Sequence, residues 1–285
     1  MSGDALEGLK AEGHFNVEAV REHYDRLSFF YRALWGEHIH HGYWENSETP
    51  SSAQEKLIER LATLACIKPG SRVLDVGCGL GGSSLWLARH LNCSVLGLNI
   101  STVQVSMAKE KARVEGLDGR AEFRVFDANH LDLPTESFDV IWVIECSEHI
   151  TDKAQFISDC ARVLKKGGTL ALCAWLKSES LSSPGGEQLV SDVCQGMLCP
   201  GLATLQDYTQ CMRASGLQLL EASDITQHVK ETWTRCEEVV RRQEIKALIG
   251  AADERTRQFV DTFSLMREAF ESGAMGYGMF AAVKA

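Results

Sequence analysis

The chain has 285 residues, of which 45% are hydrophobic and 24% are charged, an ordinary composition for a globular protein. Its net charge is −10, and it has no dense stretch of Lys and Arg, which argues against DNA, RNA and anionic membranes as partners. No segment approaches the ~18 consecutive apolar residues that a membrane span needs, so we expect no membrane insertion.

Cysteine usage and the N-terminus bear on the cellular compartment. The ten cysteines form no CxxC pair and no Cys/His cluster with zinc spacing, so we expect no metal centre and free thiols in a reducing compartment. Residues 1–12 are acidic and lack the apolar stretch of a signal peptide. These features predict a cytoplasmic protein, and they are compatible with either a monomer or a homodimer.

The N-terminal part is predicted to be helical. Asn16 is suited to cap a helix that runs toward Leu34. A segment rich in tryptophan, tyrosine and histidine follows at 35–44. Ser51 and Gln54 have the spacing of a capping box and predict the start of a second helix. We expect residues 1–65 to form a helical cap.

From residue 72 onward the pattern alternates between strands and helices. Strands are predicted at 72–76, 94–98, 121–125, 138–143, 169–173 and 217–223. Helices are predicted at 82–91, 101–115, 152–164 and 205–215. Apolar strands that alternate with helices indicate a parallel sheet covered on both faces, so residues 66–225 are expected to form an α/β core.

The remaining segments depart from this alternation. Residues 176–203 form a Ser/Gly-rich insertion with no predicted element. Residues 226–272 have a helical pattern throughout, and we expect 226–275 to form a helical lid insertion. The last core strand is expected within 276–285, with Met275–Gly278 as a turn that leads into it.

The strongest motif is a glycine-rich loop at 73–82, which reads VLDVGCGLGG. An apolar strand runs directly into this loop, and a helix is predicted to begin at Gly82. The glycines allow a tight turn and the close approach of a ligand, which the N-terminal amides of the helix then face. The loop residues Gly77, Cys78 and Gly79 are therefore candidates for cofactor binding.

Two kinds of cofactor use such a loop. Gly77, Gly79 and Gly82 match the GxGxxG fingerprint of dinucleotide binders, which is weak evidence alone. Asp75 favours S-adenosylmethionine (SAM), because a carboxylate there suits a cationic amino group and would sit poorly beside a pyrophosphate. Asn99 ends the second strand, where dinucleotide binders carry an acidic residue, which also counts against NAD.

Through these residues and motifs, the chain resembles the Rossmann-like (class I) SAM-dependent methyltransferases. It is most similar to the γ-tocopherol methyltransferase-like group, which is related to the sterol and cyclopropane-fatty-acid methyltransferases. The matching segments are Tyr24-Asp25, WGEHIHHGY at 35–43, the glycine loop with Ser83-Ser84, 97–104, Phe138-Asp139, ECSEH at 145–149 and ARV at 161–163. The family fold implies a mostly parallel seven-stranded sheet with helices on both faces, plus an N-terminal helical cap and a helical lid.

The resemblance also implies contacts with the nucleoside of SAM. Gln104 matches a residue that contacts the ribose hydroxyls, and Asn99 would share this role, since both amides donate and accept hydrogen bonds. Asp127 and Ala128 follow the third strand, where the family binds the adenine amino group. The alternative interpretation of Asp127 is an ordinary turn residue.

Two further residues are implied to lie against the cofactor. Glu145 ends the fourth strand, at the edge of the sheet where ligands of open α/β folds bind and where relatives place the methionine part of SAM. Tyr24 matches a tyrosine that covers the cofactor, and a core aromatic is the alternative interpretation.

The activated methyl group of SAM leaves the enzyme mainly to align the acceptor and exclude water. A phenol or carbon acceptor also has to lose a proton, for which His is the usual base near neutral pH. The candidate catalytic residues are His149, with Glu148 beside it, and His40 and His41, with His38 in the same segment. The alternatives are a backbone-bonded histidine at a helix start for His149 and packing beneath a lid for the others.

We therefore expect methyl transfer to nitrogen, carbon or oxygen of a lipophilic, ring-containing small molecule in secondary metabolism, with S-adenosylhomocysteine (SAH) as the product of SAM. A second hypothesis is an enzyme of this fold that binds SAM and catalyses a rearrangement or cyclisation, with or without methyl transfer. The mass of the product distinguishes the two.

Overall fold

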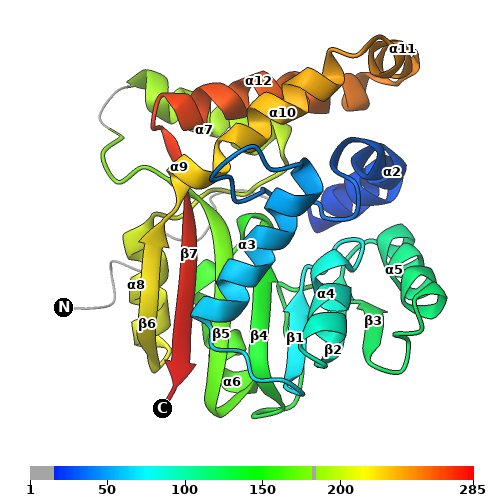
Figure 1. Ribbon diagram of the computed structural model, residues 1–285. Coiled ribbons are helices and arrows are strands. Elements are labelled where there is room, and N and C mark those ends of the chain that lie inside the picture. The colour runs from blue at the N-terminus through cyan, green and yellow to red at the C-terminus, as the bar shows by residue number, and fades with distance from the viewer. Residues whose placement is uncertain (1–15, 182–183) are drawn as a thin grey trace.

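The computed structural model describes residues 16–181 and 184–285. Its centre is a seven-stranded sheet with the order β3-β2-β1-β4-β5-β7-β6 (Figure 1). The strands are β1 (Arg72–Val76), β2 (Ser94–Asn99), β3 (Ala121–Val125), β4 (Phe138–Ile144), β5 (Leu164–Lys177), β6 (Leu217–Asp224) and β7 (Met275–Lys284). The first five strands are parallel, and β7 runs antiparallel to both β5 and β6.

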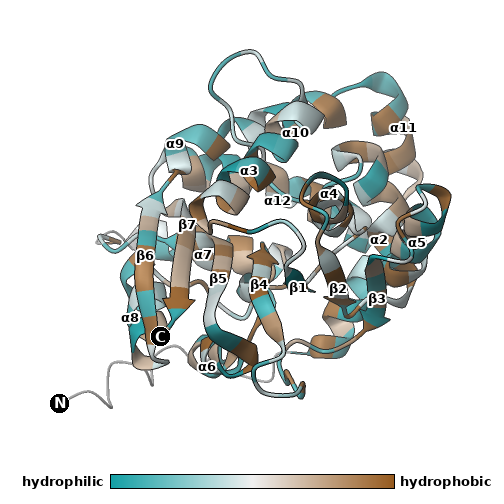
Figure 2. Cartoon of the chain, turned by 60° about the horizontal axis from the view of Figure 1, so that its bottom comes forward, coloured by the Kyte–Doolittle hydropathy of each residue, from teal (hydrophilic) through white to brown (hydrophobic). Residues whose placement is uncertain are grey.

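Helices cover both faces of the sheet, so the central strands are apolar along almost their whole length. One face packs against α3 (Pro50–Leu64), α4 (Gly82–His90) and α5 (Thr102–Val114). The other packs against α6 (Lys153–Val163) and α8 (Leu205–Ala214). The edge strand β6 is half-exposed and carries both hydrophilic and hydrophobic residues (Figure 2).

A third group of helices lies above the carboxyl ends of the parallel strands (Figure 1). These helices are α2 (Val17–Trp35), α7 (Pro184–Gly196), α9 (Thr226–Val229), α10 (Glu231–Val240), α11 (Gln243–Ala251) and α12 (Glu254–Glu271). Buried aromatic side chains of α2, α10 and α12 join the same hydrophobic core as α3 and α4. The ends of β1, β2 and β4 are therefore enclosed between the sheet and this helical layer.

These features confirm the predicted fold class. Asn16 caps α2, as predicted, by accepting hydrogen bonds from the amides of Glu18 and Ala19. Ser101 caps α5 and accepts from the amide of Gln104 at 3.0 Å. Helix α2 is fixed over this cap, because the Ser101 hydroxyl donates to Asp25 at 2.6 Å.

The capping box predicted at Ser51 is wrong. The N-cap of α3 is Thr49, whose hydroxyl accepts from the amide of Ser52. Gln54 has a different task, because its buried side chain donates to the carbonyls of Trp35, His38 and His40 at 3.2, 2.6 and 3.2 Å. A buried amide thus holds the tryptophan–histidine segment against α3.

Two further expectations are corrected, and one is refined. The insertion at 176–203 contains helix α7, which packs against α12 with buried Val190 and Val193. The segment 226–272 is helical, as expected, but it is divided into four helices, and Asp253 caps the last of them. Met275–Gly278 is not a turn, since these residues already pair with β5.

Within the described ranges, no helix is both long enough and apolar enough to cross a membrane.

Candidate active site

The site is built from three adjoining recesses at the carboxyl ends of β1, β2 and β4. We call them the strand-end pocket, the loop recess and the aromatic pocket. The strand-end pocket and the loop recess meet at Gly77 and Gly79. The strand-end pocket and the aromatic pocket share Tyr24, Glu145 and His149. A ligand in the first pocket therefore reaches both neighbours.

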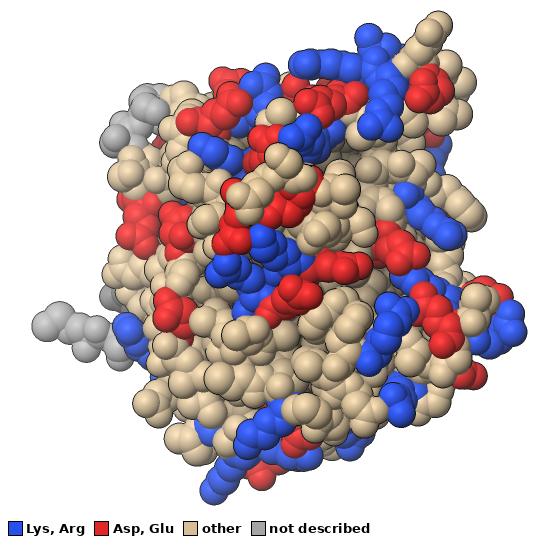
Figure 3. Space-filling view, viewed as in Figure 1, with Lys and Arg blue, Asp and Glu red and all other residues tan. Residues whose placement is uncertain are grey.

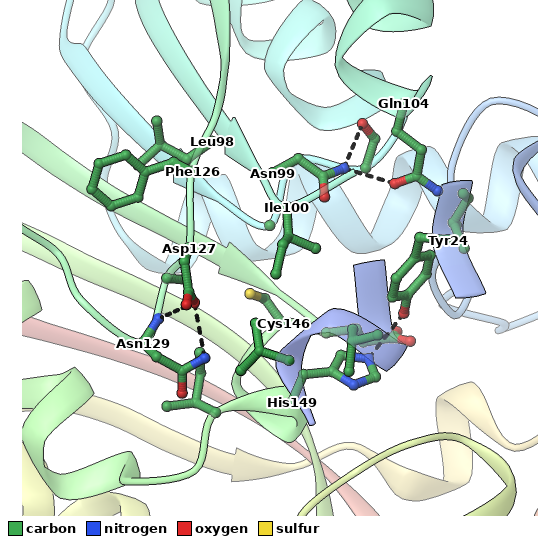
Figure 4. Close-up of a pocket in the computed structure, with 18 of the residues that line it drawn as sticks. Tyr24, Leu98, Asn99, Ile100, Gln104, Phe126, Asp127, Asn129, Cys146 and His149 are labelled. Atoms are coloured by element: carbon green, nitrogen blue, oxygen red, sulfur yellow. Dashed lines mark hydrogen bonds between the residues drawn. The ribbon is translucent and has the colours of Figure 1, made fainter. Parts of the chain in front are cut away.

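The strand-end pocket has a volume of about 90 Å³. Apolar side chains line much of it, including Leu98, Ile100 and Phe126, and polar side chains stand at its two ends (Figure 4). Gln104 and Asn99 lie on one side, and Asp127 and Asn129 on the other (Figure 4). The pocket lining also includes Ala128, Ile144 and Cys146.

The glycine loop forms the floor where the strand-end pocket meets the loop recess. Gly77 has φ +79°, and a Cβ atom there would lie 2.5 Å from the Cys146 Sγ, so only glycine fits. Gly79 has φ +53° and open space beside it. The Cys78 amide donates to the Leu98 carbonyl at 3.0 Å, so Cys78 secures the loop and lines the loop recess with its remaining atoms.

Asp75 lines the loop recess beside Gly77, His38 and His40. Its carboxylate accepts a hydrogen bond from the Ser84 hydroxyl at 2.5 Å. Burial raises the pKa of Asp75 to about 7, and the hydrogen bond from Ser84 offsets only part of this effect. A buried carboxyl with one protein donor is suited to receive a cationic group from a ligand.

The amides of Asn99 and Gln104 do different things. Asn99 donates to the Gln104 Oε1 at 2.7 Å and to the Gly79 carbonyl at 3.1 Å, and its own oxygen accepts from the amide of Ser101. The Gln104 Nε2 is buried and has no partner among the described residues. Asn99 therefore orients Gln104, a residue of the pocket lining whose side-chain nitrogen is a free donor among the described residues.

Asp127 stands at the opposite end of the strand-end pocket. Its Oδ1 accepts from the backbone amide and the side-chain amide of Asn129, both at 2.9 Å. These two bonds hold the carboxylate in place (Figure 4). They involve one oxygen, which leaves the other with capacity for a donor such as an exocyclic amino group.

The aromatic pocket is smaller, at about 40 Å³, and lies beneath the helical layer. Its apolar wall consists of Tyr31, Trp35, Trp175, Met197, Trp233 and Phe259. Its polar members are Tyr24, His40, His41, Glu145, Glu148 and His149. All four candidate catalytic residues are thus brought together in one cavity, whereas His38 lines the loop recess.

Glu145 is held by four protein donors. Its Oε1 accepts from the His41 amide at 2.7 Å, from the His41 Nδ1 at 3.0 Å and from the Tyr277 hydroxyl at 2.7 Å. Its Oε2 accepts from the Trp175 Nε1 at 3.0 Å. Burial raises the pKa of Glu145, but the attraction of the His41 ring when that ring is protonated, together with the hydrogen bonds from His41, outweighs this effect and lowers the pKa to about 2.

The ionised Glu145 fixes the tautomer of His41. A carboxylate oxygen only accepts, so the His41 Nδ1 carries a proton, and in the neutral ring Nε2 is then an acceptor. The His41 Nε2 is buried and has no partner among the described residues. The ring is held at its protonated side and packs against Trp175, Trp233, Phe270 and Tyr277.

His149 is fixed on both sides. Its Nδ1 donates to the Leu198 carbonyl at 3.0 Å, so its Nε2 accepts from the Tyr24 hydroxyl at 2.9 Å (Figure 4). Burial lowers the pKa of His149, which is therefore neutral near pH 7. His40 donates from Nδ1 to the His41 carbonyl at 2.8 Å, and its Nε2 is buried and unpaired.

Glu148 has the opposite electrostatic environment to Glu145. It is 1% exposed, and its Oε1 accepts from the Trp175 amide at 2.6 Å. Burial raises the pKa of Glu148 to about 8, and the negative charge of Glu145 adds to this effect. Two neighbouring carboxyls with pKa values driven apart are a frequent sign of an acid–base site.

Sequence reasoning missed Trp175 and Tyr277 as members of the site. Trp175 stands near the carboxyl end of β5, a position that a parallel strand does indicate. Tyr277 comes from the antiparallel strand β7 and gave no comparable signal. No group of three or more His, Cys, Asp or Glu side chains within the described part of the chain is arranged to hold a metal ion.

Together, the fold and the recesses define a protein that binds a nucleoside-containing, cationic cofactor next to an apolar cavity. A family model described as a methyltransferase domain matches residues 74–172. The 27-O-demethylrifamycin SV methyltransferase of Amycolatopsis mediterranei (strain S699) is 34% identical over 269 residues, which cover 92% of this chain and 95% of that protein. The chloroplastic tocopherol O-methyltransferase of Arabidopsis thaliana is 27% identical, over 94% of this chain and 82% of that protein.

A solved structure agrees with this fold. The crystal structure of the 4+2 cyclase SpnF superposes with a TM-score of 0.78 and 27% identity, over 93% of this chain and 94% of that one. The chain therefore belongs to the class I SAM-dependent small-molecule methyltransferases, the family that also includes the tocopherol methyltransferases, and its cofactor is SAM. The resemblance inferred from the sequence is confirmed.

Proposed function

We propose that this enzyme transfers the methyl group of SAM to a hydroxyl oxygen of a lipophilic, ring-containing small molecule of secondary metabolism. The observation that carries this proposal is the aromatic pocket, which adjoins the strand-end pocket and shares Tyr24, Glu145 and His149 with it. Two relatives, the 27-O-demethylrifamycin SV methyltransferase and the tocopherol O-methyltransferase, are named as acting on oxygen, which favours oxygen over nitrogen or carbon.

We assign the cofactor contacts as follows. The cationic amino group would lie near Asp75, with Gly77, Cys78 and Gly79 as the backbone cradle and Glu145 behind them. The ribose hydroxyls would meet the free amino group of Gln104, which Asn99 orients. The adenine amino group would meet Asp127 and the backbone of Ala128, and Tyr24 would cover the opening between the pockets.

Bound SAM supplies an electrophilic methyl group, so the protein has to hold the acceptor in line and take up its proton. We assign the proton to the His41 Nε2, because Glu145 already occupies the opposite side of the ring. His149, which is tied to Tyr24, would hold the acceptor in place. His40 and Glu148 complete the polar lining.

The helical layer is assigned as cap and lid. In this assignment residues 1–65 and 226–275 close the site, and residues 66–225 and 276–285 form the core. The aromatic pocket of about 40 Å³ holds only a few atoms, so a larger acceptor requires the helices to move apart. Within the described part of the cap, α2 contributes Tyr24, Tyr31 and Trp35 to the pocket wall.

The surface favours a small-molecule acceptor over a nucleic acid. The face in Figure 3 shows Lys and Arg interspersed with Asp and Glu rather than gathered in a basic area. The net charge of −10 has the same implication. The ten cysteines are all free thiols, which supports a cytoplasmic location.

A cyclisation or rearrangement is the second candidate function. The specific observation in its favour is the likeness to the SpnF cyclase at 27% identity over almost the whole chain. A cyclase of this fold would use the same aromatic pocket to fold a polyene without spending SAM.

Product analysis separates the two functions. The purified protein would be incubated with SAM and a panel of phenols, hydroquinones and hydroxyl-bearing macrocycles, and the products weighed by mass spectrometry. A product heavier by one methyl group, formed with an equal amount of SAH, supports the proposal. A product of unchanged mass that forms without SAH would support cyclisation instead.

A further inference from the structure

Glu148 combines burial with an unpaired oxygen inside the aromatic pocket. It lies in the short helix η1 (Ser147–His149) that follows β4. Its Oε1 accepts from the Trp175 amide, whereas its Oε2 is buried and has no partner among the described residues. A buried polar atom without a partner is costly to the fold, so it is a position where a ligand atom would be bound favourably.

The groups around Glu148 determine whether its carboxyl is protonated or ionised when a ligand binds. Trp175 joins the two carboxyls, because its amide donates to Glu148 and its indole donates to the ionised Glu145. The positive charge of Lys153 offers only partial compensation, since its Nζ donates to the Ile150 and Gly201 carbonyls rather than to Glu148. Glu148 is therefore protonated at neutral pH, with a pKa of about 8 caused first by burial.

The other titratable groups that influence Glu148 do not change this picture. Those from the surrounding elements are Tyr24, Cys146, Cys173, Cys199, Tyr208 and Tyr277. Burial raises the pKa of each of these groups, so all are neutral. His40, His41 and His149 line the same pocket, and burial lowers the pKa of His40 and of His149, so these two rings are neutral. Among the described residues, Glu145, Lys153 and, when it is protonated, His41 can carry charge beside Glu148.

We propose that Glu148 is an uncharged hydrogen-bond donor that recognises a lone-pair oxygen of the acceptor, close to the hydroxyl that is methylated. This inference rests on the proposed function and narrows its substrate class. Glu148 and His41 line the same cavity, so one acceptor molecule can contact both of them. The class is an acceptor with a carbonyl, ether or second hydroxyl oxygen near its reactive hydroxyl.

Binding of two matched probes tests this role without turnover. Calorimetry would compare 2,3-dihydroxynaphthalene with 2-naphthol, each titrated into the SAH-loaded enzyme. The wild type should bind the diol about tenfold more tightly than the mono-ol, a typical value for one buried hydrogen bond. Glu148→Gln should keep this preference, because its amide also donates, and Glu148→Leu should lose it. A preference that survives in Glu148→Leu, or disappears in Glu148→Gln, would overturn the proposal.

An infrared measurement tests the charge state independently of any acceptor. The difference spectrum between wild type and Glu148→Gln at pH 7 should contain the C=O band of a protonated carboxyl, which should fade as the pH rises through about 8. Absence of the band at pH 7 would contradict the proposal. If neither naphthol bound to the wild type, the proposed function would be in question, while the infrared band would still decide the state of Glu148.

Discussion

Asp75 is the residue at which burial and cofactor binding are most directly coupled. Its pKa of about 7 means that the carboxyl is only partly ionised near neutral pH before the cofactor binds. A cationic amino group binds the ionised form better, so SAM binding has to lower this pKa. The neighbouring His38 and His40 do not interfere, because burial lowers the pKa of both and keeps them neutral.

The first prediction concerns SAM affinity and pH. Affinity should rise as the pH rises through about 7 and fall again above about 8, where the α-amino group of SAM loses its proton, and at pH 6 it should be several-fold weaker than at its maximum. Below pH 7, each SAM bound should release close to one proton. Calorimetry in two buffers of different ionisation enthalpy measures this number. Asp75→Asn should bind more weakly with no proton release, and proton uptake by the wild type would refute the assignment.

The second prediction concerns His41. His41→Asn keeps a donor to Glu145 but removes the acceptor nitrogen, so turnover should fall by about 10²–10⁴-fold with SAM affinity unchanged. The exposed His90 on α4 offers a control, because His90→Asn removes an imidazole remote from the pockets. If His41→Asn turned over as fast as the wild type, the proton would have to go elsewhere, and the same substitution at His149 and His40 would locate it.

Residue types near strand ends were predictable, but their pairings were not. Asp75 and Asp127 are indicated by their positions near the carboxyl ends of parallel strands, where ligands of such sheets bind. Gln104 is indicated by the family resemblance. The sequence does not show that the Asn99 amide donates a hydrogen bond to Gln104. It also does not show that Glu145 accepts hydrogen bonds from His41, Trp175 and Tyr277. Such bonds join residues that are far apart in the chain, so they depend on the assembled fold.

At the scale of elements, the tryptophan–histidine segment is positioned by helix α3. Gln54 on this helix donates to three carbonyls of the segment, and the segment in turn covers the glycine loop. A Cβ at Gly82 would lie 2.5 Å from the His38 Nδ1, which shows how closely the two pack. The geometry of His40 and His41 therefore depends on a residue outside the pocket.

The third prediction tests this dependence. Gln54→Leu should lower the free energy of unfolding by about 1–3 kcal/mol, because three carbonyls lose their buried donor, and it should also slow turnover. The matched control is Gln155→Leu on α6, where an exposed amide contacts only Asp159. Its cost should stay within about 0.5 kcal/mol. Urea unfolding measures both, and equal costs would contradict the role of Gln54.

Elements with strong periodicity were predictable, and irregular ones were not. The strand at 121–125 and the start of α4 at Gly82 agree with the sequence pattern. Helix α7 was not predicted because it begins in a segment rich in Ser and Gly. Its apolar face becomes apparent only in its packing against α12. The breaks between α9, α10, α11 and α12 were also not predicted, since apolar residues recur along the whole segment, although α11 contributes only the partly buried Ile249 to the core.

For the molecule as a whole, two buried carboxyls have opposite effects on the free energy of unfolding. Glu145 has a lowered pKa of about 2, so it stabilises the fold above pH 4.5, and this contribution is lost as the pH falls toward 2. Glu148 has a raised pKa of about 8, so its unfavourable contribution grows as the pH rises from 4.5 to 8. Glu148 therefore lowers the free energy of unfolding near neutral pH, so its presence is explained by function rather than by stability.

The fourth prediction follows from this linkage. Relative to wild type, Glu148→Gln should gain unfolding free energy as the pH rises from 4.5 to 8, by a few kcal/mol in total, and the difference should be constant below pH 4.5. Denaturant unfolding at a series of pH values measures this difference. A difference that does not vary with pH would show that Glu148 is ionised in the folded protein.

Methyl transfer from SAM to an acceptor oxygen in the aromatic pocket is the reaction that we propose for this enzyme. The most direct test uses SAM with an isotopically labelled methyl group, incubated with the enzyme and a hydroxyl-bearing aromatic or macrocyclic acceptor, followed by NMR of the product. We predict one labelled methyl group on oxygen for each SAH formed, and loss of this signal in His41→Asn. A converted acceptor that carries no label would contradict methyl transfer to oxygen and identify the protein as a cyclase or isomerase of the methyltransferase fold.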